Sequence, residues 1–367
     1  MSDLRVRGGS LDVDIAGGLV AASSAGPVLD ATGLTVLPGL IDLQVNGAAG
    51  LDVTDQPERL WEVGSALAAY GVTAWLPTVI TSDPAARDRA LATLAAGLPA
   101  GWLGAVPLGL HLEGPMLALD RRGAHPPTWL APPSMDLIEG WSRSAGVAMV
   151  TLAPELPGAL EVIAELVARG VIVSIGHTDA DSARVAAAMA AGARCLTHLG
   201  NAMPPMLARE PGPVGAAFGG TELVAGVIAD GHHLHPDFLR TAWRALAPSR
   251  FLSVSDTTAA LGRPDGPTRL GDQEVYVADG AVRLEDGTLA GSAVSLIACL
   301  RVLRAVTGAD LDDVVATATT TPAALLGDET RGRIARGRRG DLTLVDEALA
   351  PVVTVVGGVV ASDARDR

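Results

Sequence analysis

The side chains of this chain that are best suited to bind a metal or move a proton follow short apolar segments. The chain has seven histidines, and five of them lie at the ends of such segments, with a sixth in a loop further on. Two carboxylates and two amides occupy similar places. The set is His111, His125, His177, His198, His232, His233, Glu113, Asp256, Gln44 and Asn46. Imidazole and carboxylate groups bind divalent metals and act as general acids and bases, so the set predicts a metal or acid–base site.

The elements that carry these residues alternate between two kinds. Eight apolar runs of strand length are separated by amphipathic or alanine-rich stretches of helical length. The runs are 40–45, 72–79, 105–112, 147–152, 171–175, 195–198, 223–228 and 251–255, and the clearest helical stretches are 58–70, 84–96, 159–168, 182–191 and 236–247. This alternation predicts an α/β fold, a (β/α)8 TIM-type barrel. Since such barrels carry their chemistry at the carboxyl ends of the strands, the polar residues are expected to meet there.

The two ends of the chain differ from this pattern. Residues 1–38 and 333–367 contain short strands and glycine turns without helices. We expect them to form one small β-sandwich domain, with the barrel spanning 39–332, because the termini of compact chains often lie close together. A hairpin is expected at 274–277 and 281–284, around Asp279-Gly280.

The composition excludes several kinds of chemistry. All 27 basic residues are arginine, which removes Schiff-base and pyridoxal enzymes, P-loop nucleotidases and metal pairs bridged by a carboxylated lysine. A net charge of −14 opposes binding to nucleic acid or an anionic membrane. The two cysteines do not support a disulfide framework, and we find neither a signal peptide nor a membrane-spanning run, so a cytoplasmic protein is expected.

Several motifs, in order and over nearly the whole chain, resemble one family. They are VLPGLIDLQVNG, HLEGP with RGAH downstream, IGHTDA, THLGNAMPPM followed by REPG, ADGHH, SVSD and TLAGS. They are similar to the N-acetylglucosamine-6-phosphate deacetylases of the amidohydrolase superfamily. The resemblance implies a metal-bearing barrel with a small β domain built from both termini.

The resemblance also implies the metal site. Glu113, His177 and His198 would be the ligands of one divalent ion per subunit, with zinc expected and Fe²⁺, Mn²⁺ or Co²⁺ as alternatives. Many amidohydrolases have His-x-His at the end of the first strand to bind a further metal. Here Gln44 and Asn46 take those places, so we expect a single metal.

By the same resemblance, Asp256 would be the general base and acid, and His125 would stabilise the oxyanion. Arg209, His233 and the backbone N–H groups of Asn201 and Ala202 would bind a phosphate. The other substrate-binding residues would be Ala124, Asp230, Leu289, Ala290 and Gly291. A structural reading remains for some of them: Asp256 could cap a helix, and Arg209 could pair with Glu210. Arg121-Arg122 suggest a lid, while His232 and His235 receive no role.

The function that follows is metal-dependent hydrolysis of N-acetylglucosamine 6-phosphate to glucosamine 6-phosphate and acetate. A homodimer is implied, since a neighbouring subunit supplies part of the phosphate site in relatives. One alternative is the same reaction on N-acetylgalactosamine 6-phosphate. Others are an unphosphorylated acetamido sugar or cyclic amide as substrate, or a sugar-phosphate sensor without catalysis.

Overall fold

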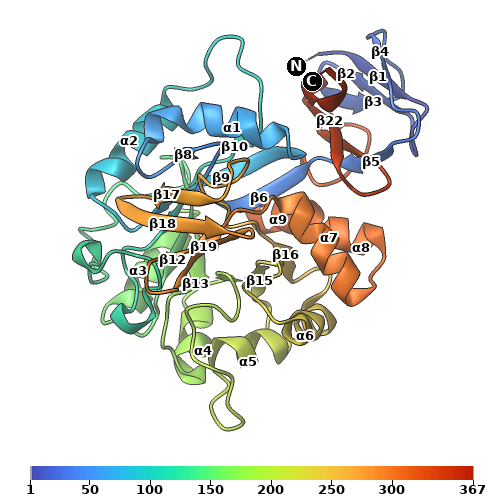
Figure 1. Cartoon of the computed structure of the whole chain (residues 1–367). Coiled ribbons are helices and arrows are strands. Elements are labelled where there is room, and N and C mark those ends of the chain that lie inside the picture. The colour runs from blue at the N-terminus through green and yellow to red at the C-terminus, as the bar shows by residue number, and fades with distance from the viewer. Residues whose placement is uncertain (1, 367) are drawn as a thin grey trace.

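Parallel strands form a barrel at the centre of the structure, a computed structural model that describes residues 2–366 (Figure 1). Neighbouring strands follow the chain order from β6 and β9 to β16, as in a TIM-type barrel. The strands are β6 (Leu40–Val45), β9 (Val72–Ile80), β10 (Val106–Pro107), β11 (Leu110–Glu113), β12 (Val147–Leu152), β13 (Ile172–Ile175), β14 (Cys195–Leu196), β15 (Val224–Val227) and β16 (Phe251–Ser253). The predicted barrel is confirmed. The single strand predicted at 105–112 is wrong, because Gly109, at φ +116°, divides it into β10 and β11.

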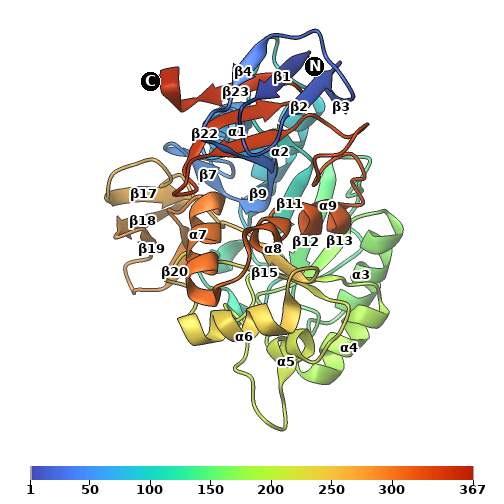
Figure 2. The ribbon, with the colours of Figure 1, turned by 90° about the vertical axis from the view of Figure 1, so that its right-hand side faces the viewer.

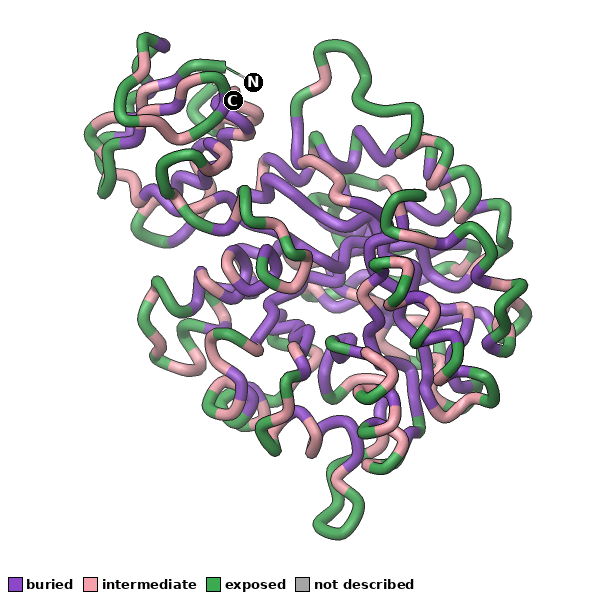
Figure 3. The backbone as a smooth tube through the Cα atoms, turned by 180° about the vertical axis from the view of Figure 1, so that it is seen from behind, coloured by how far each residue is buried: buried purple, intermediate pink, exposed green. Residues whose placement is uncertain are grey.

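Helices cover the barrel, and the strands beneath them are buried on both faces (Figure 3). The five predicted helices are all present. They are α1 (Leu60–Ala68), α2 (Pro84–Ala95), α3 (Ala159–Ala168), α4 (Ser182–Ala190) and α6 (Pro236–Leu246). The remaining helices were not predicted from the sequence: α5 (Gly212–Phe218), α7 (Leu296–Thr307), α8 (Leu311–Ala316), α9 (Thr320–Leu326) and the 3-10 turns η1 (Pro57–Arg59), η2 (Leu119–Arg121), η3 (Pro127–Trp129) and η4 (Ala364–Asp366). None of the helices within residues 2–366 has the length and apolar composition needed to span a bilayer.

Strands from both termini form two sheets beside the barrel (Figure 2). The first sheet has the order β3-β2-β1-β4 and the second the order β23-β22-β21-β5. Residues of both sheets, among them Val6, Ile15, Leu344 and Val353, share one apolar cluster, as the β-sandwich prediction requires. The strands are β1 (Leu4–Arg7), β2 (Val13–Ala16), β3 (Leu19–Ala21), β4 (Val28–Asp30), β5 (Thr35–Pro38), β21 (Leu342–Val345), β22 (Pro351–Val356) and β23 (Val359–Asp363). The domain limits at 38/39 and 332/333 stay a prediction.

A four-stranded antiparallel sheet follows the last barrel strand. It consists of β17 (Gly266–Leu270), β18 (Gln273–Ala278), β19 (Ala281–Arg283) and β20 (Leu289–Ser292). The predicted hairpin is confirmed as β18 and β19 within this larger sheet. Its apolar residues pack on Ile80 and Ala124, so the sheet covers one side of the barrel mouth. Near the same mouth, β7 (Gly47–Ala48) and β8 (Leu51–Asp52) form a short ribbon.

Candidate metal and active site

A cavity of about 320 Å³ opens at the carboxyl ends of the barrel strands. Thirteen of the predicted site residues line it: Asn46, Glu113, Ala124, His125, His177, His198, Asn201, Ala202, His233, Asp256, Leu289, Ala290 and Gly291. Gln44, Arg209 and Asp230 do not. The prediction missed Ile80, Asp120, Gly123, Leu270 and Thr288, which also line the cavity. Asp120 and Gly123 flank Arg121-Arg122, so the sequence could have predicted them together with that pair. Leu270 and Thr288 belong to the segment that forms the antiparallel sheet β17–β20, and they line the cavity only because this sheet folds over it.

Three predicted ligand atoms form a tight triangle. Glu113 Oε1 lies 3.2 Å from Nε2 of His177 and 3.2 Å from Nε2 of His198, and the two nitrogens are 3.0 Å apart. Ligands of a tetrahedral ion with bonds of about 2.0–2.1 Å are separated by roughly 3.3–3.4 Å. The triangle is therefore close to the size of one face of such a site, and these residues fit a zinc-sized cation.

The Nδ1 nitrogen of His177, which is not part of the triangle, is bound by a main-chain oxygen. This Nδ1 donates to the backbone oxygen of Arg121 at 2.9 Å, which leaves the Nε2 lone pair available to bind a metal ion. Gln44, at a position where many amidohydrolases have a histidine, donates its Nε2 to Glu113 Oε1 at 3.1 Å. Burial opposes the charge of Glu113, but the imidazoles of His177 and His198 beside its carboxylate hold its pKa well below the usual value.

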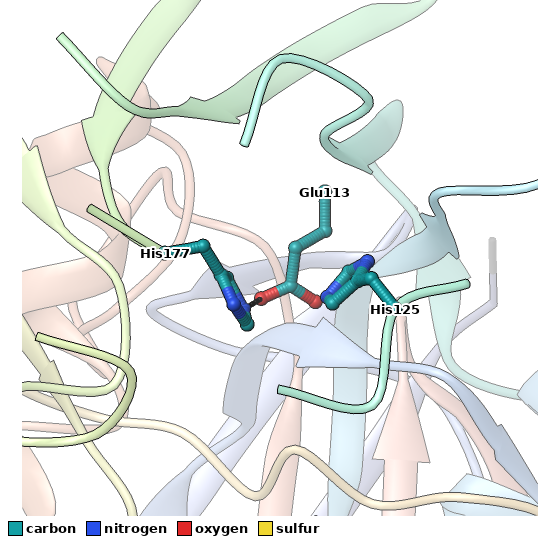
Figure 4. A group of neighbouring side chains, drawn as sticks. All are labelled: Glu113, His125 and His177. Atoms are coloured by element: carbon teal, nitrogen blue, oxygen red, sulfur yellow. Dashed lines mark hydrogen bonds and ion pairs between the residues drawn. The ribbon is translucent and has the colours of Figure 1, made fainter. Parts of the chain in front are cut away.

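His125 lies on the other side of the Glu113 carboxylate (Figure 4). Atoms of Glu113, His125 and His177 fall within 4.8 Å of one another, so His125 is near enough to be considered as a ligand. However, its Nδ1 accepts the backbone N–H of Thr81 at 3.3 Å. Burial and the neighbouring His177 lower its pKa to about 3, which favours a neutral ring with its proton on Nε2. A neutral His125 is therefore suited to donate a hydrogen bond. His198, whose Nε2 lies 3.2 Å from Glu113 Oε1, is better placed than His125 to be a metal ligand.

Asp256 is buried at the cavity wall and is held by an amide. Asn46 Nδ2 donates to its Oδ1 at 2.7 Å. Burial, followed by the charge of Glu113, raises the pKa of Asp256 to about 7. A carboxyl group with such a pKa can both accept and return a proton near neutral pH.

Four residues of the cavity have left-handed backbones without being glycine. They are His177 (φ +50°), His198 (φ +31°), Ala202 (φ +50°) and Asp256 (φ +49°). This conformation is unfavourable for residues with a Cβ and costs on the order of 1–3 kcal/mol each. Such strain concentrates at functional sites, and no sequence pattern indicated it here.

The predicted substrate residues His233 and Asp230 lie at different distances from the cavity. His233 lines the cavity, whereas the Asp230 side chain is fully buried behind it. Asp230 Oδ2 is 2.7 Å from His233 Nδ1, and its Oδ1 accepts the backbone N–H groups of His232 and His233. Asp230 thus orients His233 and does not reach the cavity itself.

Arg209 lies away from the cavity of its own chain. It belongs to an exposed stretch, residues 205–210, in the segment that projects from the barrel just before α5 (Figures 1 and 2). The alternative pairing with Glu210 is not present, because Glu210 accepts from the backbone N–H and hydroxyl of Ser182 at 2.7 and 2.6 Å. No ion pair involves Arg209 among residues 2–366.

The remaining histidines have structural surroundings. His111 is buried in β11, two residues before Glu113, where its Nε2 lies 2.7 Å from the Thr151 hydroxyl, and burial lowers its pKa to about 4. His232 and His235 are exposed, and His235 caps α6 through its Nδ1.

Arg121 of the predicted lid pairs with Asp179 at 2.8 Å.

Comparison with known proteins gives the family. Residues 35–361 match the amidohydrolase family, whose members are metal-dependent. An N-acetylglucosamine-6-phosphate deacetylase of Caenorhabditis elegans is 37% identical, with 90% of this chain and 83% of the relative covered. An N-acetylgalactosamine-6-phosphate deacetylase of Shewanella sp. is 36% identical, with 85% and 79% covered.

A solved structure agrees over nearly the whole chain. It is a point mutant of N-acetyl-D-glucosamine-6-phosphate deacetylase from Mycobacterium smegmatis in complex with N-acetyl-D-glucosamine 6-phosphate. That chain is 31% identical, its TM-score is 0.87, and the match covers 98% of this chain and 100% of the other. The fold, the cavity and these likenesses together place this chain in the amidohydrolase family, among the N-acetylglucosamine-6-phosphate deacetylases.

Proposed function

We propose that this protein hydrolyses the acetamide of N-acetylglucosamine 6-phosphate to give glucosamine 6-phosphate and acetate. The observation that carries the proposal is the joint placement, in one cavity, of the Glu113, His177 and His198 triangle and the Asp256 carboxylate. A metal-binding face next to a proton-transfer group is the arrangement that amide hydrolysis needs. The relatives described above are deacetylases of phosphorylated amino sugars.

Glu113, His177 and His198 are the residues that would hold one divalent ion, and zinc suits two imidazoles and a carboxylate. When bound, such an ion supplies Lewis acidity that activates water and polarises a carbonyl. A second ion has poor ligands at the first strand, since Gln44 and Asn46 already bind Glu113 and Asp256 through their amide nitrogens. We therefore propose a mononuclear site.

The proton transfers fall to Asp256. With Oδ1 held by Asn46, we assign Oδ2 to accept the proton of the attacking water and to deliver it to the sugar nitrogen as the C–N bond breaks. His125 is suited to donate a hydrogen bond from its Nε2–H to the carbonyl oxygen as negative charge develops there. The acetyl group leaves as acetate and the nitrogen as the free amine of the sugar.

The phosphate site is proposed to involve two chains. His233, oriented by Asp230, lines the cavity of the same subunit together with Asn201 and Ala202. The backbone N–H of Asn201 already donates to His198 O at 3.0 Å, so of the two predicted main-chain donors we propose that of Ala202 for the phosphate. Arg209 is exposed on a projecting segment together with Met206 and Leu207, which are 53% and 57% exposed. Since exposed apolar side chains on a projecting segment suit a protein contact, we propose a homodimer in which Arg209 reaches the neighbouring cavity.

The test is acetate release by the purified protein, measured with elemental analysis of the same sample. N-acetylglucosamine 6-phosphate, its galacto epimer and unphosphorylated N-acetylglucosamine are compared by kcat/KM. We expect the first to be preferred and one metal per chain. A preference for the galacto epimer or the unphosphorylated sugar would change the substrate, and binding without turnover would indicate a sensor.

A further inference from the structure

Asp42 is a buried carboxylate that the proposed reaction does not use. It lies in β6, two residues before Gln44, and is 0% exposed. Its Oδ2 has no hydrogen-bond partner among the described residues. Charged groups are rarely buried in this way without a specific role, so the contacts of Asp42 are the guide to what it does.

The barrel has a seam between its first and last strands. Residues 2–366 contain no continuous ladder between β6 and β16. At the end of the seam that is nearest the start of β6, the turn between α8 and α9 fills the gap. There, Ile41 N–H donates to Ala318 O at 2.8 Å and Ser253 N–H donates to Thr317 O at 3.1 Å. At the end nearest the cavity, Asp256 N–H donates to Gln44 O at 3.0 Å. The middle of the seam lies between these two sets of bonds.

Asp42 occupies that middle position. Its Oδ1 accepts the backbone N–H of Ser255 and that of Gln44, both at 3.3 Å. The side chain therefore takes the place of a main-chain carbonyl and links β6 to the segment that follows β16. Without it, two buried N–H groups would lack an acceptor, which folded proteins avoid.

The same contact stabilises a bulge that turns Gln44. From Asp42 to Val45, three steps along β6 face only two along β9, from Trp75 to Pro77, so β6 contains one extra residue. Bulges redirect the side chains that follow them. Here the redirected side chain is Gln44, whose Nε2 reaches Glu113. The segment that Asp42 holds after β16 continues from Ser255 directly into Asp256.

We propose that Asp42 is a positioning residue: its Oδ1 joins β6 to the segment that follows β16 and thereby sets Gln44 against the metal-binding Glu113 and Asp256 beside Asn46. The proposal rests on the proposed deacetylase function for its catalytic consequence, but its effect on metal binding does not depend on the substrate. The acceptor oxygen carries the role. An asparagine keeps an oxygen that can accept both N–H groups, whereas an alanine does not.

The experiment compares three variants with the wild type. Asp42→Ala removes the acceptor, Asp42→Asn keeps it, and Ser253→Ala is the matched control. Ser253 lies in the same seam and its hydroxyl bonds Thr317 at 2.7 Å, but it does not line the cavity. For each variant we measure the metal dissociation constant by competition with a chelator, kcat and KM per folded and metal-loaded chain, and hydrogen exchange of peptides covering 40–46 and 251–257.

Asp42→Ala is expected to weaken metal binding about tenfold or more, in line with other residues that support metal ligands. We also expect kcat at least tenfold lower with KM changed less than threefold, and faster exchange in both peptides. Asp42→Asn and Ser253→Ala should stay within threefold of wild type in metal affinity and kcat. If Asp42→Ala does not fold, the Asp42→Asn result still decides.

Two outcomes would overturn the proposal. One is an Asp42→Ala protein that binds metal and turns over like the Ser253→Ala control. The other is an Asp42→Asn protein as defective as a site variant, which would mean that the charge and not the acceptor geometry matters. A wild-type protein without deacetylase activity would instead refute the proposed function, and the metal-affinity comparison would still test Asp42.

Discussion

Replacing Asn46 by leucine should shift the pH dependence of the reaction. Asn46 Nδ2 donates to Asp256 Oδ1 at 2.7 Å, and this bond favours the ionised form of the carboxylate. A hydrogen bond to a charged group contributes about 1.5–3 kcal/mol, and each pKa unit corresponds to about 1.4 kcal/mol. Losing the bond should therefore raise the pKa of Asp256 by roughly 1–2 units. Leucine has a similar volume, so the change removes the donor without opening a large cavity.

The sign of the shift follows from the role of Asp256 as the base. The ionised carboxylate is active, so activity falls as the pH drops through its pKa. A higher pKa moves the acid limb of kcat/KM to higher pH by the same 1–2 units, while activity well above the limb recovers to near the wild-type level.

The assay is kcat/KM for acetate release from pH 5 to 9, with metal content measured at each pH. Thr288→Val serves as the control, since Thr288 lines the same cavity but makes no hydrogen bond to Asp256. An Asn46→Leu enzyme that keeps its metal and shows an unshifted acid limb would refute the assignment of Asp256 as the base held by Asn46.

Three further predictions concern the metal, the phosphate and the backbone. Glu113→Gln should lose the ion, so elemental analysis should find well under one metal per chain; retention of a full ion would contradict the ligand set. Arg209→Ala should lower kcat/KM for the phosphorylated sugar by roughly 30- to 900-fold, corresponding to about 2–4 kcal/mol; an unchanged value would remove Arg209 from the phosphate site. Gly291→Ala should impair activity and lower Tm, because φ is +71° and an added Cβ would lie 2.8 Å from the Asp256 backbone oxygen, whereas Gly287→Ala, at φ +88° with open space around it, should show the backbone strain alone. Equal effects of the two alanines on activity would argue against the clash at Asp256.

The sequence was sufficient for the barrel and for most of the cavity wall. Buried strands read as apolar runs, and residues that follow them must meet at one end of a parallel barrel. These two rules are enough to predict that Glu113, His177, His198 and Asp256 lie together, and all four line one cavity. The prediction depends only on the order of the strands and helices along the chain and not on how their side chains pack.

Other features depend on strand register and on contacts between distant segments. Gln44 and Asn46 looked like vacant ligand positions, yet their amides bind Glu113 and Asp256, 69 and 210 residues away. Asp230 was expected beside the substrate and instead lies behind His233, because its carboxylate satisfies two backbone N–H groups of its own turn. The sequence places Arg209 close to cavity residues along the chain, but the projecting segment carries it away from its own cavity.

The sequence by itself thus determined which chemical groups stand at the strand ends, since that follows from periodicity and residue type. Only the tertiary structure decided which atom of each group faces the cavity and which residue holds it. The bulge at Asp42 shows the physical reason. One extra residue in β6 reverses the direction of the side chain after it, and such a change in register depends on pairing with β9 and on the contact of Asp42 with Ser255 rather than on the local sequence.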